Sequence, residues 1–135
     1  VAIALADGEL VRAVVEGCAY GGYERPKYKS DDSAAAVEEI LIVAPGADTG
    51  AFEAGRIVGE SVNVTRRLVD TPANDLGPEE FADMAESMGK AAGLDVEVLD
   101  EPALEALGAG SLLSVARGSA RPPRLVRLSW NPTDA

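Results

Sequence analysis

The sequence predicts an α/β fold, with mixed or mostly parallel strands and helices that alternate along the chain. Short runs of β-branched and leucine residues are separated by longer segments whose apolar residues recur every three or four positions. Glycine, proline or aspartate stands between most of these segments, where helix caps and turns belong. The 135 residues are 47% hydrophobic, which suffices for one sizeable core or for parts of two smaller ones.

The first half of the chain predicts two strands that alternate with two helices. Alternating apolar residues indicate a strand at about residues 1–6, and a β-branched and leucine run indicates another over 39–43. Apolar residues spaced three and four apart indicate a helix over 9–21 and a long helix over 48–69.

The long helix contains small residues that bear on its packing. Gly55 and Gly59 each weaken a helix by about 1 kcal/mol relative to alanine. We therefore interpret them, together with Ala54, as positions where another element packs closely against this helix.

The stretch 68–81 ends the long helix, makes a rigid turn and begins the next helix. Pro72 biases Thr71 away from helical angles, and Pro78 is pre-set for a first helical turn. The helix that follows carries an apolar stripe and is expected to end near Gly93, a typical C-terminal cap.

The rest of the chain predicts two strands and short helices. Alternating apolar and acidic residues indicate a strand over 94–99, and a short helix capped by Asp100 follows over 100–108. The segment 110–116 fits a short helix or a strand. A final strand is expected over 124–130, after the stiff Pro122-Pro123 pair.

The charge balance of the chain is strongly acidic. Twelve Lys and Arg oppose 23 Asp and Glu, which gives a net charge of −11, and both halves of the chain are acidic. Such a surface repels phosphate backbones and anionic lipids, so nucleic-acid and membrane-surface roles are disfavoured. No run of residues is long and apolar enough to span a bilayer.

Histidine is absent and cysteine occurs once. The absence of histidine excludes a Ser-His-Asp triad, a histidine-containing zinc site and a histidine general base within this chain. Cys18 stands beside Ala19, near Val14 and Val15, so a small buried thiol is expected, and a nucleophilic role is disfavoured. A single cysteine fits a reducing, cytoplasmic compartment.

Two groups of charged side chains each allow a functional and a structural interpretation. Asp95 and Glu97 are paired on the wet face of a strand, where solvation is favoured over acid-base chemistry or metal binding because no third ligand lies nearby in the sequence. Four arginines near the end of the chain form either an anion site or, as favoured, partners of nearby acids: Arg117, Arg121, Arg124 and Arg127.

Two loops invite a nucleic-acid or nucleotide interpretation. Tyr23–Ser30 interleaves aromatic and basic residues, but packing is favoured over nucleic-acid binding because it offers three cations in a negative field. Gly108-Ala109-Gly110 lacks the third glycine and the structural setting of a phosphate-binding loop. The sequence therefore predicts no nucleotide site.

Three segments, in order along the chain, carry a resemblance to a known family. Asn63–Ala82 and Gly110–Ser119, the latter followed by Pro122-Pro123 and a strand, resemble signatures of the leucyl (cytosol) aminopeptidase family, peptidase family M17. A weaker likeness covers Val14–Lys29. Gly77 stands where the family often has threonine, and Asp70 stands where asparagine is frequent.

The resemblance implies a two-domain enzyme, usually a hexamer, that uses two divalent metal ions (Zn or Mn) to remove N-terminal residues from peptides. The family's metal ligands lie in a glycine-rich segment with lysine and aspartate and in an Asn-Thr-Asp-Ala-Glu-Gly-Arg segment, both beyond the final strand. Asn131–Ala135 is similar to the second segment only superficially, because Pro132 interrupts it and the Glu-Gly-Arg is absent. We therefore expect no catalytic, metal-binding or cofactor-binding residue in this chain.

The resemblance also divides the chain into incomplete portions of two domains joined by a long helix. Residues 1–46 correspond to the end of the N-terminal α/β domain, 47–70 to the connecting helix and 71–135 to the start of the catalytic domain. We expect the chain alone to be inactive and to associate through exposed apolar faces. The alternative is a non-catalytic binding or assembly module on the same scaffold, and a DNA-binding role fits poorly with the negative charge.

Overall fold

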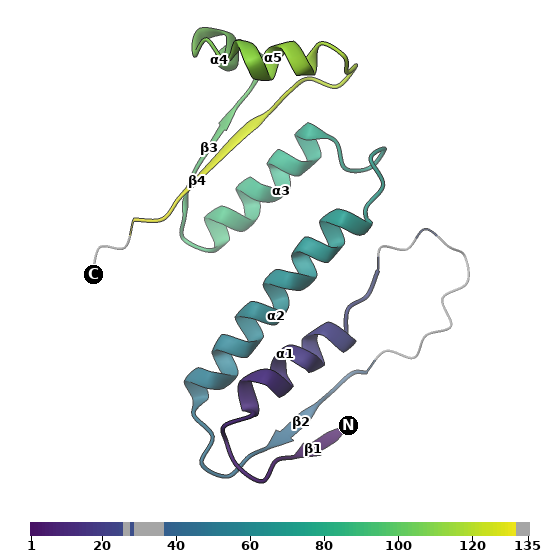
Figure 1. Ribbon diagram of the computed structural model, residues 1–135, viewed down its shortest axis with the longest axis vertical. Coiled ribbons are helices and arrows are strands. Elements are labelled where there is room, and N and C mark those ends of the chain that lie inside the picture. Colours follow the sequence, from purple (N-terminus) through teal and green to yellow (C-terminus); the bar gives the residue numbers. More distant parts are fainter. Residues whose placement is uncertain (26–27, 29–36, 132–135) are drawn as a thin grey trace. The chain divides into compact units, whose positions relative to one another are not determined.

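The computed structural model describes residues 1–25, 28 and 37–131 (Figure 1). Two compact units divide the chain, Val1–Thr71 and Pro72–Ala135. The α/β prediction is confirmed, and the strands are mixed, with one parallel and one antiparallel pair. The elements in order are β1 Ala2–Ala4, α1 Val11–Gly21, β2 Leu41–Val43, α2 Thr49–Asp70, α3 Pro78–Ala91, β3 Asp95–Leu99, α4 Glu101–Ala106, α5 Gly110–Ala116 and β4 Leu125–Ser129.

The first unit combines a short parallel pair, β1 and β2, with two helices that lie side by side (Figure 1). A Cβ atom on Gly59 would overlap the Cβ of Ala19, and one on Gly55 would lie 2.7 Å from the carbonyl oxygen of Arg12. The two glycines therefore let α1 approach the backbone of α2, which confirms the packing predicted for them. Val15 of α1, which is 6% exposed, is buried at this contact.

The second unit packs α3 against the antiparallel pair of β3 and β4, which α4 and α5 connect (Figure 1). Val96 and Leu128 are register partners in this pair. A Cβ atom on Gly89 would lie 2.7 Å from Cγ2 of Val96 and 2.9 Å from Cδ2 of Leu128. Gly89 thus lets α3 approach the two strands closely, and Leu104 of α4 is fully buried in the same unit.

Several element boundaries differ from those predicted. The strands expected at 1–6, 39–43 and 124–130 are shorter, because a strand extends only as far as its partner's hydrogen bonds reach. Bonds beside β1 nevertheless continue the pairing, since Leu41 N–H donates to Val1 and Leu5 N–H donates to Val43. The helix expected from residue 9 begins at Val11, after a turn in which an Asp7 carboxylate oxygen accepts the Glu9 N–H.

Residues 110–116, for which the sequence allowed a helix or a strand, form the helix α5. Ser114 Oγ donates to the Ser111 carbonyl at 2.8 Å, a bond within the helix. A strand here would have needed a neighbouring strand to pair with, whereas α5 has α4 beside it (Figure 1). The neighbouring element therefore decides between the two structures.

Candidate functional site

Three of the four predicted arginines form ion pairs with glutamates of the second unit. Arg121 Nη1 lies 3.0 Å from Glu80, and Arg127 Nη2 lies 3.0 Å from Glu97. Arg124 Nη2 contacts Glu79. The interpretation that these cations neutralise acids is confirmed for these three, and the structure records no ion pair for Arg117 among the residues it describes.

Arg121 also reaches the turn that precedes α3. Its Nη2 donates to the carbonyl oxygen of Asn74 at 2.5 Å, while Nη1 donates to Glu80 Oε2. The same carboxylate oxygen accepts the N–H of Gly77 at 2.9 Å. Hydrogen bonds from the backbone N–H groups of Glu80 itself and of Gly77, and then the charge of Arg121, lower the pKa of Glu80.

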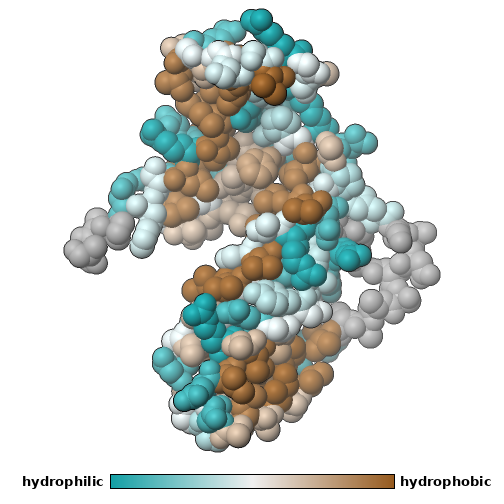
Figure 2. Space-filling model, in the orientation of Figure 1, coloured by the Kyte–Doolittle hydropathy of each residue, from teal (hydrophilic) through white to brown (hydrophobic). Residues whose placement is uncertain are grey.

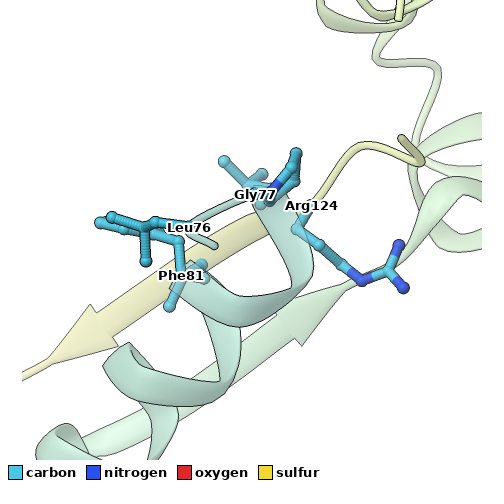
Figure 3. Close-up of a pocket in the computed structure, with 7 residues that line it drawn as sticks. Leu76, Gly77, Phe81 and Arg124 are labelled. Atoms are coloured by element: carbon cyan, nitrogen blue, oxygen red, sulfur yellow. The ribbon is translucent and has the colours of Figure 1, made fainter. Parts of the chain in front are cut away.

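An open pocket of about 550 Å³ lies beside this ion-pair network in the second unit (Figure 3). Figure 3 shows the Arg124 guanidinium directed away from Leu76 and Phe81, consistent with its pairing to Glu79. Arg124 is the ionisable residue among the described lining residues, which offer no acid, base, nucleophile or metal ligand. The lining comprises Leu76, Gly77, Pro78, Phe81, Arg124, Leu125 and Val126.

A smaller hollow of about 180 Å³ contains Arg117, the arginine for which the anion-site alternative stayed open. Glu101 lines the same hollow, so its carboxylate opposes an anion beside Arg117. Arg121 also lines it but is paired with Glu80. The described residues therefore favour no anion site here.

The paired carboxylates of β3 are exposed, as predicted for a solvated face. Glu97 pairs with Arg127, its register partner on β4, and Asp95 accepts from Asn131 Nδ2 at 3.4 Å. Within the described ranges, no group of three His, Cys, Asp or Glu side chains comes together as a metal site would require. Among the described residues, these carboxylates have no third ligand beside them.

The remaining candidates have simple structural positions. Cys18 is half-buried on α1, so the expectation of a buried thiol is wrong in degree: α2 covers its helix on one side only. Gly108 has φ of +74°, a left-handed conformation that follows α4 and is typical of a helix end. Asn131 is described, whereas residues 132–135 lie outside the described residues.

Part of the aromatic and basic loop is described, and Tyr23 packs as predicted. Its hydroxyl donates to Asp70 Oδ2 at 3.1 Å, and the Arg66 guanidinium lies 4.2 Å from the ring centroid. Partial removal from water, and then the hydrogen bond to Asp70 and its charge, raise the pKa of Tyr23. The rest of this loop, apart from Glu24, Arg25 and Tyr28, lies outside the described residues.

The contacts that sequence reasoning missed join distant residues. Arg121 is 47 positions from Asn74, and Tyr23 is 47 positions from Asp70. No local pattern in the sequence predicts such pairs. Among the described residues, no helix is long and apolar enough to cross a membrane.

Comparisons with known proteins agree with one another. The family model described as the cytosol aminopeptidase family, catalytic domain, matches residues 63–135. A probable cytosol aminopeptidase of Nocardia farcinica is 43% identical over 127 residues, which cover 89% of this chain and 25% of that relative. A probable cytosol aminopeptidase of Mycobacterium leprae is 42% identical over 120 residues, covering 86% and 23%.

Solved structures give the same picture. The bottromycin maturation enzyme BotP in complex with Mn superposes with a TM-score of 0.78 at 35% identity, covering 94% of this chain and 26% of that one. A leucyl aminopeptidase from Trypanosoma cruzi superposes with a TM-score of 0.76 at 26% identity, covering 98% and 27%. The chain thus spans about a quarter of the length of the proteins it matches.

Proposed function

Because the chain belongs to the cytosol aminopeptidase family, peptidase family M17, we propose that it forms part of a hydrolase that removes N-terminal residues from peptides. The observation that carries the proposal is the match of residues 63–135 to the family's catalytic domain. The relative from Nocardia farcinica supports it, since its identity of 43% extends over nearly the whole chain. The proposed substrates are peptides with a free N-terminus.

The proposal assigns a role to each part of the chain. Residues 1–46 form the end of an N-terminal domain, 47–70 the connecting helix and 71–135 the beginning of the catalytic domain. Two findings support this division. The match to the catalytic domain begins at Asn63, within α2, and the first compact unit ends at Thr71, after that helix.

We propose two divalent metal ions, Zn or Mn, for the full-length enzyme. The Mn complex of BotP, a related structure, supports metal use in the family. The described residues of this chain do not fit such a site, because no three carboxylate or cysteine side chains come together and the sequence has no histidine. We therefore propose that the metal-ligating and catalytic residues belong to other segments of the full-length protein.

The proposed protein is a cytoplasmic homo-oligomer, a hexamer by family resemblance, without nucleic-acid or membrane partners. The relatives bear the name cytosol aminopeptidase, which supports the location. The net charge of −11 argues against binding to nucleic acid or to anionic lipid.

An activity assay tests whether the catalytic residues belong to other segments of the full-length protein. The purified 135-residue chain is incubated with leucine p-nitroanilide and with Mn²⁺ or Zn²⁺, beside a metal-only blank. We expect no hydrolysis above the blank. A rate above the blank that a chelator abolishes would contradict the assignment of the catalytic residues to other segments.

The coding sequence of the gene tests the enzyme against the non-catalytic module. An in-frame glycine-rich segment with lysine and aspartate, followed by Asn-Thr-Asp-Ala-Glu-Gly-Arg, is expected downstream of the codon for Ala135. A stop codon there would exclude the enzyme for this gene product and support the binding or assembly module.

A further inference from the structure

Gly77 occupies a position where the backbone does not require glycine. It is the N-cap of α3, with φ of −94° and ψ of −173°, an extended conformation open to every residue type. Serine, threonine, aspartate and asparagine are preferred at N-caps because their side chains accept a free backbone N–H of the first turn. Glycine is also common at N-caps but supplies no side-chain acceptor, so the space that a capping side chain would fill is open to another group.

Arg121 fills this space and so constrains position 77. A Cβ atom on Gly77 would overlap Nη1 of Arg121 and lie 2.8 Å from its Cδ, and 2.8 Å from Oε2 of Glu80. The guanidinium therefore lies where an N-cap side chain would be. Any side chain at position 77 must displace it.

The guanidinium is held there by hydrogen bonds to two separate segments. Nη2 donates to the Asn74 carbonyl at 2.5 Å, and Nη1 donates to Glu80 Oε2 at 3.0 Å. Glu80 in turn accepts the Gly77 N–H at 2.9 Å. On its own segment, the backbone N–H of Arg121 donates to Ser119 Oγ at 3.0 Å, which fixes the chain from which the side chain extends.

We propose that Arg121 and Glu80 form a conformational clamp, and that Gly77 is the residue that makes room for it. The clamp joins the turn before α3, the first turn of α3 and the segment before β4. It takes the place of a local N-cap side chain, so the start of α3 depends on a residue 44 positions away in the sequence.

The clamp predicts that Gly77→Thr has opposite effects on stability in the native chain and in the Arg121→Ala chain. With Arg121 present, Gly77→Thr displaces the guanidinium and breaks its bonds to Asn74 and Glu80. With Arg121→Ala, the guanidinium is gone and the end of the Glu80 side chain, which then has no arginine partner, can shift aside. The threonine hydroxyl can then accept the N–H of Glu80, as an ordinary N-cap does. Threonine should therefore destabilise the native chain and stabilise the Arg121→Ala chain.

The experiment compares four versions of the 135-residue chain: native, Gly77→Thr, Arg121→Ala and the double variant. Hydrogen exchange is measured on each chain at the backbone amides of Gly77, Glu79, Glu80 and Phe81, since Pro78 has no amide proton, and urea unfolding is measured beside it. We expect protection at these amides to fall about fivefold in either single variant, the size of a lost N-cap, and to recover in the double variant.

Two substitutions serve as matched controls. Arg117→Ala removes an arginine for which the described residues provide no ion pair, and Gly110→Ala adds a Cβ atom where nothing lies within 4 Å. Neither is expected to change exchange at 77–81. Gly77→Ala is a milder probe for the case in which the threonine variant does not fold, and it should lower protection more in the native background than in the Arg121→Ala background.

Specific outcomes would overturn the clamp. Equal effects of Gly77→Thr in both backgrounds, or stabilisation of the native chain, would show that Arg121 is not the constraint. If neither chain that carries Gly77→Thr folds, Gly77→Ala decides. Equal effects of Gly77→Ala with and without Arg121 would also show that Arg121 is not the constraint. If Arg121→Ala fails to fold alone, the proposal requires that adding Gly77→Thr restores folding, and it falls if folding is not restored.

Discussion

At the scale of single residues, Leu104 is the most completely buried side chain that the structure describes. It is 0% exposed, on a helix of six residues that has little stability of its own. We expect Leu104→Ala to lower the free energy of unfolding by about 2–5 kcal/mol, measured by urea unfolding. Leu107→Ala, at a leucine that is 64% exposed just after the same helix, is the control and should change little; equal effects would contradict the burial.

Glu80 gives a residue-level prediction on pH. Its pKa is lowered in the folded chain, so the stability it contributes is present above the ordinary glutamate pKa of about 4.3 and is lost as pH falls through the folded value. We expect Glu80→Gln to melt below the native chain at pH 7 and the gap to close toward pH 3. The measurement is thermal melting across that range.

The control for this prediction is Glu105→Gln, at an exposed carboxylate for which the described residues provide no side-chain partner. It should shift the melting temperature little at any pH. A gap between the native chain and Glu80→Gln that stayed constant from pH 7 to pH 3 would rule out the carboxylate as the titrating group.

At the scale of elements, the contact between α1 and α2 depends on Gly59. A larger side chain there would overlap Ala19, so we expect Gly59→Leu to destabilise the chain by about 1–3 kcal/mol in urea unfolding. Gly17→Ala is the matched control on α1, because a Cβ atom there meets nothing within 4 Å. It should raise stability slightly through helix propensity, and a stable Gly59→Leu would refute the close approach.

The elements also show what local patterns decide. The periodicity of α3 and its start at Pro78 follow from the sequence, because apolar spacing and the proline angle act within one or two turns. The choice of helix for 110–116 was open, since a seven-residue segment carries too few turns to establish a period. Its position beside α4 resolved it.

At the scale of the whole molecule, much apolar surface meets solvent. Figure 2 shows apolar residues on the surfaces of both units. Among the described residues, Val69, Val115 and Trp130 are 78%, 82% and 75% exposed. The buried hydrophobic side chains in the same ranges are Val11, Val15, Ala82 and Leu104.

The exposed apolar surface favours self-association, whereas the net charge of −11 opposes it. Repulsion between acidic surfaces weakens as salt shortens the Debye length to about 10 Å at 0.1 M and about 3 Å at 1 M, whereas apolar attraction does not. We expect size-exclusion chromatography with light scattering to show association of the 13.9 kDa chain that increases from 20 to about 500 mM NaCl. A sharp monomer peak at every salt concentration would contradict this.

The sequence by itself determined the alternation of helices and strands, the stop and restart around Pro72 and Pro78, and the family. Each of these depends on residues within a few positions of one another, where side-chain spacing and backbone angles act directly. The absence of histidine likewise excluded whole classes of site without any structure. Even the close-packing role of Gly55 and Gly59 was readable, because glycine in a helix interior needs a reason.

Only the tertiary structure decided which distant groups meet. It gave the antiparallel register of β3 with β4, the pairing of Arg127 with Glu97, and the position of the Arg121 guanidinium over Gly77. The physical reason is that an ion pair or a strand register depends on where packing brings two segments, not on the residues beside each partner. The sequence places four arginines near the end of the chain, and the tertiary structure pairs three of them with glutamates.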